Sequence, residues 1–304
     1  MIRRISLLAA LLAVQVSAAH AADPSPLKVL VTNDDGVAAL GIDALVNALT
    51  ANPNLAVTVI APAANSSGTG EQANLTTPIT TTAATTASGH PATAVGGFPG
   101  DTTLWALRHQ LASDPPDLVV SGINQGQNLS AEVTPLSGTV GAATWAARLG
   151  VPAIAVSAGF TLTPANFAAA ADYAAKVVEA YRTKVTFRRR MLERDDPKRA
   201  IVLNINFPTC ATGTSVRGVR VVATGRGTTL NGYTLTGDDG TTKTFQPSTS
   251  VVNPFSHNCA STAAPGATDV ATLPVGFATV SPLTAERSIT GRRLRDFAFL
   301  EKLF

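Results

Sequence analysis

The sequence has few charged and aromatic side chains. Charged residues make up 14% of its 304 residues and aromatic residues 5%, and the charged share lies well below the usual quarter. The formal net charge is +3 and falls by two, to +1, without Arg3 and Arg4. Because a broad nucleic-acid footprint needs a strongly basic surface, this composition argues against one and favours small-molecule partners.

The motifs of several enzyme classes are also missing. No GxGxxG pattern follows the first predicted strand, which argues against a dinucleotide-dependent dehydrogenase. With only four histidines, no Ser-His-Asp order and no activated cysteine, the triad hydrolases and the histidine phosphatases are poor candidates. The two cysteines lack the CxxC or neighbouring-histidine spacing of a zinc site.

The N-terminus has the pattern of a secretory signal peptide. Arg3 and Arg4 precede an apolar run over residues 5–19, and Ala19-His20-Ala21 forms an A-x-A cleavage site. A membrane anchor is the alternative, but the run is shorter than the roughly 20 residues that a spanning helix needs. We therefore expect residues 1–21 to be a signal peptide, cleaved between Ala21 and Ala22, and the mature protein to be periplasmic or secreted.

Cys210 and Cys259 lie among Pro, Asn, Ser and Thr, as in loops. An even number of cysteines in an exported protein favours a disulfide between them. Two free thiols are the alternative, because sequence alone does not show that their Cα atoms come close.

The stretch Leu27–Gly36, LKVLVTNDDG, is the most informative in the chain. Its apolar, mostly β-branched first half predicts a buried strand, which ends at Asn33, Asp34 and Asp35. In an open α/β sheet, ligands bind beyond the carboxyl ends of the strands, and two adjacent carboxylates there favour a bound cation. The alternative is a plain turn whose Asp or Asn caps the next helix.

Strand and helix patterns alternate up to residue 208, which predicts an α/β fold with a Rossmann-like core and a mostly parallel sheet. Beyond residue 208 short Gly- and Thr-rich strands predict a smaller β-rich extension, followed by a strand over 276–283 that is ended by its proline, Pro282. We expect three regions: the signal peptide over 1–21, the core over 22–208, and the extension with a C-terminal strand and helix over 209–304, an oligomerisation region. The expected strands are 27–31, 55–60, 117–120, 151–157, 200–207, 216–224, 233–236 and 276–283, with a hairpin in 75–95. Helices are expected over 41–50, after an N-cap at Asp101, from Ser137, over 165–181 and over 297–304. We expect the last helix to expose Phe and Leu side chains that dock on a neighbouring subunit.

Further polar side chains follow other predicted strands at the same edge of the sheet. Asn65-Ser66-Ser67-Gly68 follows the second strand, and Asn124 lies in the loop after a later one. Their hydroxyl and amide oxygens suit a hard cation, although each loop alone is more often only a loop. Ser137-Gly138-Thr139 opens a helix, which makes either an anion site or an ordinary Ser N-cap.

Taken together, these segments resemble the SurE family of metal-dependent nucleotidases. The resemblance rests on motifs in the family's order, with weaker matches in LNINFP (203–208) and in 269–283, so that it spans nearly the whole mature chain. The stronger motifs are VTNDDG (31–36), IAPAANSSG (60–68), DLVVSGIN with GxNL (117–129), SGTVGAA (137–143) and GVPAIAVS (150–157).

The resemblance implies a function and a set of site residues. It implies a phosphomonoesterase that hydrolyses nucleoside 5' or 3' monophosphates through metal-activated water, with one Mg²⁺ or Mn²⁺ per subunit, in dimers or tetramers. A broad-specificity acid phosphatase, an exopolyphosphatase and an exported metal- or phosphate-binding protein with little turnover stay open as alternatives. The expected metal ligands are Asp34, Asp35, Ser67 and Asn124, both aspartates being catalytic; the expected substrate-binding residues are Asn65, Asn124, Asn128, Ser137, Gly138 and Thr139.

The chain also departs from the family pattern. Ala63, Ala64 and Ser66 replace the charged residues of the usually basic loop before the ligating serine, and Leu136 replaces a tyrosine. Ser130-Ala131-Glu132 stands where the family has GDD. These changes affect substrate preference and assembly more than the expected metal ligands.

Overall fold

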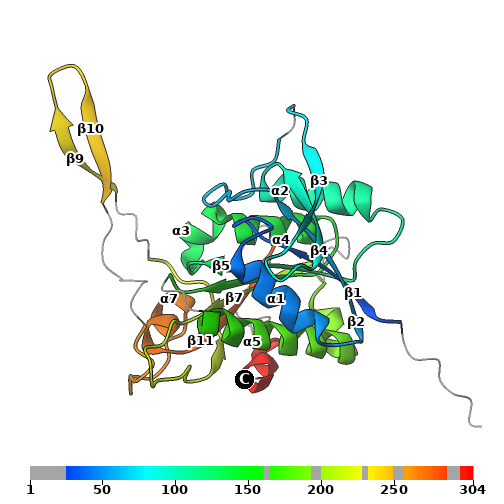
Figure 1. The fold of residues 1–304 in the computed structure, drawn as a ribbon. Coiled ribbons are helices and arrows are strands. Elements are labelled where there is room, and N and C mark those ends of the chain that lie inside the picture. Colours follow the sequence, from blue (N-terminus) through cyan, green and yellow to red (C-terminus); the bar gives the residue numbers. More distant parts are fainter. Residues whose placement is uncertain are drawn as a thin grey trace, which may run out of the picture.

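The computed structural model describes residues 25–74, 76–160, 164–192, 200–227, 232–248, 257–285 and 295–303. The expected signal peptide over residues 1–21 therefore lies outside the described residues. Within the described part, helices cover both faces of a central sheet, which gives the expected α/β architecture (Figure 1).

Nine strands of the described residues form one sheet in the order β3-β4-β2-β1-β5-β6-β7-β11-β8. The neighbouring pairs from β4 to β7 are all parallel, whereas β3 pairs antiparallel with β4 and β11 pairs antiparallel with β7. The sheet is thus mostly parallel, as predicted. Its strands are β1 (Leu27–Thr32), β2 (Leu55–Pro62), β3 (Thr80–Thr85), β4 (Pro91–Gly96), β5 (Leu118–Gln125), β6 (Ala153–Ala158), β7 (Ile201–Phe207), β8 (Val219–Val221) and β11 (Ala278–Thr284).

The two faces of the sheet are buried under different helices. Helices α1 and α5 pack over one face, which carries Val29, Val120 and Ile205. Helix α4, with the turn that follows α2, packs over the other face, which carries Leu30 and Val119. The helices are α1 (Leu40–Thr50), α2 (Pro99–Trp105), α3 (Ser130–Val133), α4 (Gly138–Arg148), α5 (Pro164–Thr183), α6 (Val185–Arg190) and α7 (Asp269–Thr272), with a π-helical turn at Ala106–Gln110 and 3₁₀ turns at Thr134–Leu136, Leu273–Val275 and Ala298–Leu303.

Two sequence predictions about element ends are wrong. Helix α2 begins at Pro99 after the N-cap Phe98, so Asp101 is its third residue and not its cap. The Asp101 carboxylate instead accepts the backbone N–H of Phe98 at 2.9 Å. Strand β11 does not end at Pro282 but continues to Thr284.

The prediction that the C-terminal segment exposes its apolar side chains is also wrong. Phe297 and Leu300 are buried, because the segment folds back over α5 and α6. The ring of Phe297 lies edge-on to that of Phe187, and the Tyr173 hydroxyl donates a 2.8 Å hydrogen bond to the Leu300 carbonyl. These apolar side chains therefore belong to the protein's own core.

Strands β9 (Gly232–Asp238) and β10 (Lys243–Ser248) form a separate antiparallel hairpin, which projects away from the body in Figure 1. The sequence indicated only the first of its two strands. Strands β8 and β11 also come from the region beyond residue 208 but join the central sheet. The division at residue 208 stays a prediction. None of the helices in the described ranges is long and apolar enough to cross a membrane.

Candidate functional site

The Asp34 side chain is held where strand β1 ends and helix α4 begins. It is 2% exposed, and its Oδ1 accepts a 2.6 Å hydrogen bond from the Thr139 hydroxyl. The Asp34 carbonyl accepts the backbone N–H of Ser66 at 2.7 Å. One predicted residue therefore joins three segments that are far apart in the sequence.

Asp35 lies at the same edge and contacts the loops that follow β2 and β5. Its Oδ2 accepts the backbone N–H of Gln125 at 3.1 Å, and its Oδ1 accepts the Asn65 amide at 3.3 Å. The Ser67 hydroxyl also lies near this carboxylate and lowers its pKa. The structure thus places Asn65, Ser67 and the end of β5 around the aspartate pair, as the parallel strand order requires.

The aspartate pair is electrostatically uncompensated within the described residues. Burial raises the pKa of Asp34 to about 6, against the lowering effect of the Thr139 hydroxyl. Burial also raises the pKa of Asp35, while hydrogen bonds from Gln125 and Ser67 lower it. In the described part of the chain no lysine or arginine forms an ion pair with either carboxylate. A cation would supply the missing positive charge.

Asn124 is the fourth predicted ligand and the last but one residue of β5. The pairing of β5 with β6 shifts register between Ser121 and Asn124, an irregularity that can re-aim the side chains beyond it. The Asn124 amide nitrogen donates to the Gly126 carbonyl at 2.6 Å, which leaves its carbonyl oxygen as the end suited to a cation.

The donors at this edge fit a hard divalent cation. No three His, Cys, Asp or Glu side chains gather into a metal cluster in the described ranges, so that a cation here would also need hydroxyl and amide oxygens. Asp34, Asp35, Ser67 and Asn124 provide two carboxylates, one hydroxyl and one amide oxygen. Such an all-oxygen set suits Mg²⁺ or Mn²⁺ and lacks the nitrogen and sulfur ligands typical of zinc.

The start of helix α4 borders the aspartates. Ser137 is its N-cap, and the Ser137 hydroxyl accepts the backbone N–H of Val140 at 3.1 Å. Gly138 packs so closely that an added Cβ would lie 2.8 Å from Cβ of Asp34. The N–H groups of Gly138 and Thr139 belong to the first helical turn, which has no acceptors within the helix. Free N–H groups at a helix start can bind an anion, and these two lie beside the predicted metal ligands.

Asn128 differs from the other predicted substrate-binding residues, because its side chain enters a buried amide cluster. Its amide nitrogen donates to the Ser157 hydroxyl at 2.8 Å, and its backbone is held by Asn204 and Asn206 of β7. The sequence analysis missed both of these asparagines. The available signal was their i, i+2 spacing in an otherwise apolar strand, which places both on one face.

Comparison with known proteins identifies the family of the chain. The family model described as "Survival protein SurE" matches residues 29–230, about two thirds of the chain. The chain belongs to the SurE family. The matched range contains every predicted metal-ligating and substrate-binding residue.

Individual SurE proteins support the assignment. A protein named 5'-nucleotidase SurE from Methanocella arvoryzae is 40% identical over 188 residues, which cover 61% of this chain and 68% of that protein. One with the same name from Parvibaculum lavamentivorans is 36% identical over 200 residues, covering 66% and 67%. The crystal structure of the SurE protein from Aquifex aeolicus superimposes with a TM-score of 0.67 at 27% identity, covering 85% of this chain and 93% of the other.

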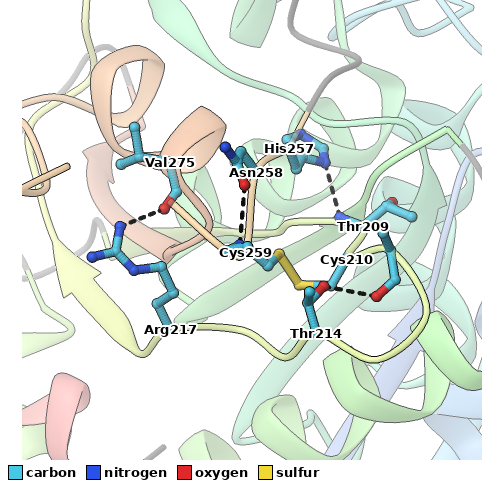
Figure 2. Close-up of a disulfide and its surroundings, with 10 residues drawn as sticks. Thr209, Cys210, Thr214, Arg217, His257, Asn258, Cys259 and Val275 are labelled. Carbon is cyan, nitrogen blue, oxygen red and sulfur yellow. Dashed lines mark hydrogen bonds between the residues drawn. A yellow bond between two sulfur atoms is a disulfide. The ribbon is translucent and has the colours of Figure 1, made fainter. Parts of the chain in front are cut away.

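The predicted disulfide is present and lies beside the SurE core. Cys210, just after β7, is bonded to Cys259, with their Cα atoms 5.5 Å apart (Figure 2). Next to it, the His257 ring accepts the backbone N–H of Thr209 at 2.8 Å. Cys259 lies beyond the range of the family model, so the bond ties the later part of the chain to the sheet.

Proposed function

We propose that this protein is a divalent-metal-dependent phosphomonoesterase that hydrolyses nucleoside 5' or 3' monophosphates. The observation that carries the proposal is the pair of adjacent carboxylates, the buried Asp34 and the partly buried Asp35, set against the open start of helix α4. The name 5'-nucleotidase, which the SurE relatives bear, supports the same reaction class.

Each part of the site has a role in this reaction. Asp34, Asp35, Ser67 and Asn124 would hold the cation. When bound, the cation would offset phosphate charge and lower the pKa of a water molecule. The N–H groups of Gly138 and Thr139 bind phosphate oxygens, and the Thr139 hydroxyl fixes the Asp34 carboxylate.

The physiological ion is proposed to be Mg²⁺ or Mn²⁺. Phosphate release is measured from 5'- and 3'-nucleotides, an aryl phosphate and short polyphosphate, after EDTA treatment and after each ion is added back. We expect EDTA to abolish release, Mg²⁺ or Mn²⁺ to restore it, and Asp35→Asn to remove it. Asp114→Asn, at an exposed surface ion pair with Lys28, is the matched control and retains activity.

The same panel separates the alternative functions. Faster release from the aryl phosphate or from polyphosphate than from every nucleotide would identify a broad acid phosphatase or an exopolyphosphatase. Metal binding without release from any substrate would identify a binding protein and refute the nucleotidase.

We further propose that the protein forms a homodimer or homotetramer through the β9–β10 hairpin. Tyr233, Leu235 and Phe245 are 70%, 46% and 52% exposed, and Phe245 pairs directly with Leu235. An isolated two-stranded hairpin is marginally stable in water, so these side chains favour a second copy as cover. Light scattering should show a smaller species when all three are changed to Ser; an unchanged mass would refute the hairpin's role.

Export to the periplasm or beyond is proposed from the N-terminal sequence pattern, and the disulfide supports an oxidising compartment. N-terminal sequencing of protein released by osmotic shock should begin at Ala22. A full-length cytoplasmic product that begins at Met1 would refute export.

A further inference from the structure

Two asparagines from strand β7 form hydrogen bonds with the backbone of Asn128. Oδ1 of Asn206 accepts the Asn128 N–H at 2.7 Å, while Nδ2 of Asn206 donates to the Asn128 carbonyl at 3.2 Å. Nδ2 of Asn204 donates to the same carbonyl at 2.7 Å. One loop residue thus has both its backbone groups bound by side chains from a strand 76 and 78 positions away in the sequence.

A second strand, β6, also binds Asn128. The Asn128 side chain donates to the Ser157 hydroxyl at 2.8 Å, and Ser157 of β6 lies directly opposite Asn206 in the sheet. All four side chains are buried, the most accessible being Asn128 at 6% exposed. We call Asn128, Ser157, Asn204 and Asn206 the amide clamp.

The amide clamp is close in sequence to the predicted metal ligand Asn124, with Gly126 between them. Gly126, two residues before Asn128, accepts the Asn124 side-chain amide at 2.6 Å, and its own N–H donates to the Ala158 carbonyl at 2.8 Å. Two residues of backbone thus connect the amide clamp to the carbonyl that accepts the Asn124 side-chain amide.

Burying Asn204 and Asn206 in β7 costs free energy that apolar residues at the same positions would not. The neighbouring residues Leu203, Ile205 and Phe207 are apolar and buried. Burying an amide costs free energy unless its hydrogen bonds are made, and apolar residues at these two positions would add packing instead. Oδ1 of Asn204 has no hydrogen-bond partner among the described residues, and the bonds that offset part of the cost, made by Nδ2 of Asn204 and by both ends of the Asn206 amide, all go to Asn128 of the site loop.

We propose that Asn206, together with Asn204, is a positioning residue that fixes the orientation of the Asn124 amide for cation binding. The inference rests on the proposed metal-dependent function. Asn206 does not touch the cation or the substrate. Its effect passes from the backbone of Asn128 to the carbonyl of Gly126 and from there to the side chain of Asn124.

The test compares Asn206→Ala, the milder Ser157→Ala and the control Thr279→Val. Thr279 is fully buried on β11 directly opposite Asn206, and valine has nearly the same shape as threonine. Mn²⁺ affinity is measured by calorimetry, and backbone hydrogen exchange is followed over residues 124–130. We expect Mn²⁺ to bind about tenfold more weakly to Asn206→Ala, because partners that orient metal ligands typically contribute 10–100-fold. Exchange should quicken in both clamp variants and stay unchanged in Thr279→Val.

The outcomes separate this inference from the proposed function. Unchanged Mn²⁺ affinity in both clamp variants would overturn the positioning role, even if wild type hydrolyses nucleotides. Wild type that binds Mn²⁺ but releases no phosphate would refute the nucleotidase, while the affinity comparison still decides the role of Asn206. Wild type that binds neither Mn²⁺ nor Mg²⁺ would overturn both. If Asn206→Ala does not fold, Ser157→Ala decides the question through the same two measurements.

Discussion

The Thr139 hydroxyl donates a 2.6 Å hydrogen bond to Oδ1 of Asp34. Both residues are buried, one at the start of helix α4 and the other just after strand β1. This bond joins the start of the helix, with its open N–H groups, to one carboxylate of the aspartate pair. The proposed phosphate-binding and metal-binding parts of the site are therefore coupled.

Replacing Thr139 by valine should separate these two parts. The change keeps the shape of the side chain but removes the hydrogen bond to Asp34, and we expect kcat/KM and Mn²⁺ affinity each to fall by about 10–100-fold. The free energy of unfolding should fall by only about 1–2 kcal/mol. Thr144→Val is the control, because the Thr144 hydroxyl bonds to the Val140 carbonyl within the same helix. Equal kinetics for the two variants would contradict the coupling.

The disulfide should stabilise the fold and leave the site unaffected. Cys210 and Cys259 are 49 residues apart, and closing a loop of this size contributes about 2–4 kcal/mol. Changing both to serine should lower the free energy of unfolding in urea by this amount at unchanged kcat. Wild-type protein should gain alkylated mass only after reduction. Thiol labelling without reduction would show that the bond is not formed.

Asp43 of helix α1 should make stability depend on pH in the acid range. Burial alone would raise its pKa, but hydrogen bonds from Ser88 and Thr86 together outweigh burial and lower the pKa below 3.8. An acid whose pKa is lowered by folding contributes stability above its unfolded value, and that stability is lost as pH falls through the folded value. Urea unfolding from about pH 6 down to about pH 3 should show a steeper loss for wild type than for Asp43→Asn. Equal slopes would contradict this assignment.

The sequence was informative where one local pattern determines one contact. Asp34, Asp35 and Ser67 follow buried strands, and the parallel order of β1 and β2 brings the two strand ends together. Asn206 could not be placed in this way, because its partner Asn128 is 78 positions away and the bond depends on the pairing of β6 with β7. Long-range register of this kind has no local signature.

The cap of helix α2 and the exposure of the C-terminal segment were predicted wrongly, because both depend on contacts that the local sequence does not show. Asp101 has the chemistry of an N-cap, but Pro99 starts the helix earlier and Asp101 binds back to Phe98. The sequence pattern of the final segment predicts exposed apolar side chains, because the helices that bury them, α5 and α6, lie more than a hundred positions earlier in the chain. Phe187 lies in T-shaped contact with Phe297 and Phe299, a cluster visible only once the chain has folded back.

Gly138→Ala offers a test of how closely helix α4 must approach Asp34. An alanine Cβ would lie 2.8 Å from Cβ of Asp34 and 3.0 Å from its Oδ2, so that the carboxylate or the helix must move. Alanine also favours the helix over glycine by up to about 1 kcal/mol, which offsets part of the strain in the free energy of unfolding. We therefore expect kcat/KM to fall by at least about tenfold, as for other disturbed metal-ligand geometry, while the unfolding midpoint changes little. Gly237→Ala, whose Cβ would make ordinary contacts at 3.5 Å from Thr244, is the control. Full activity of Gly138→Ala would show that the site tolerates displacement of Asp34 and that the close approach of the helix serves packing alone.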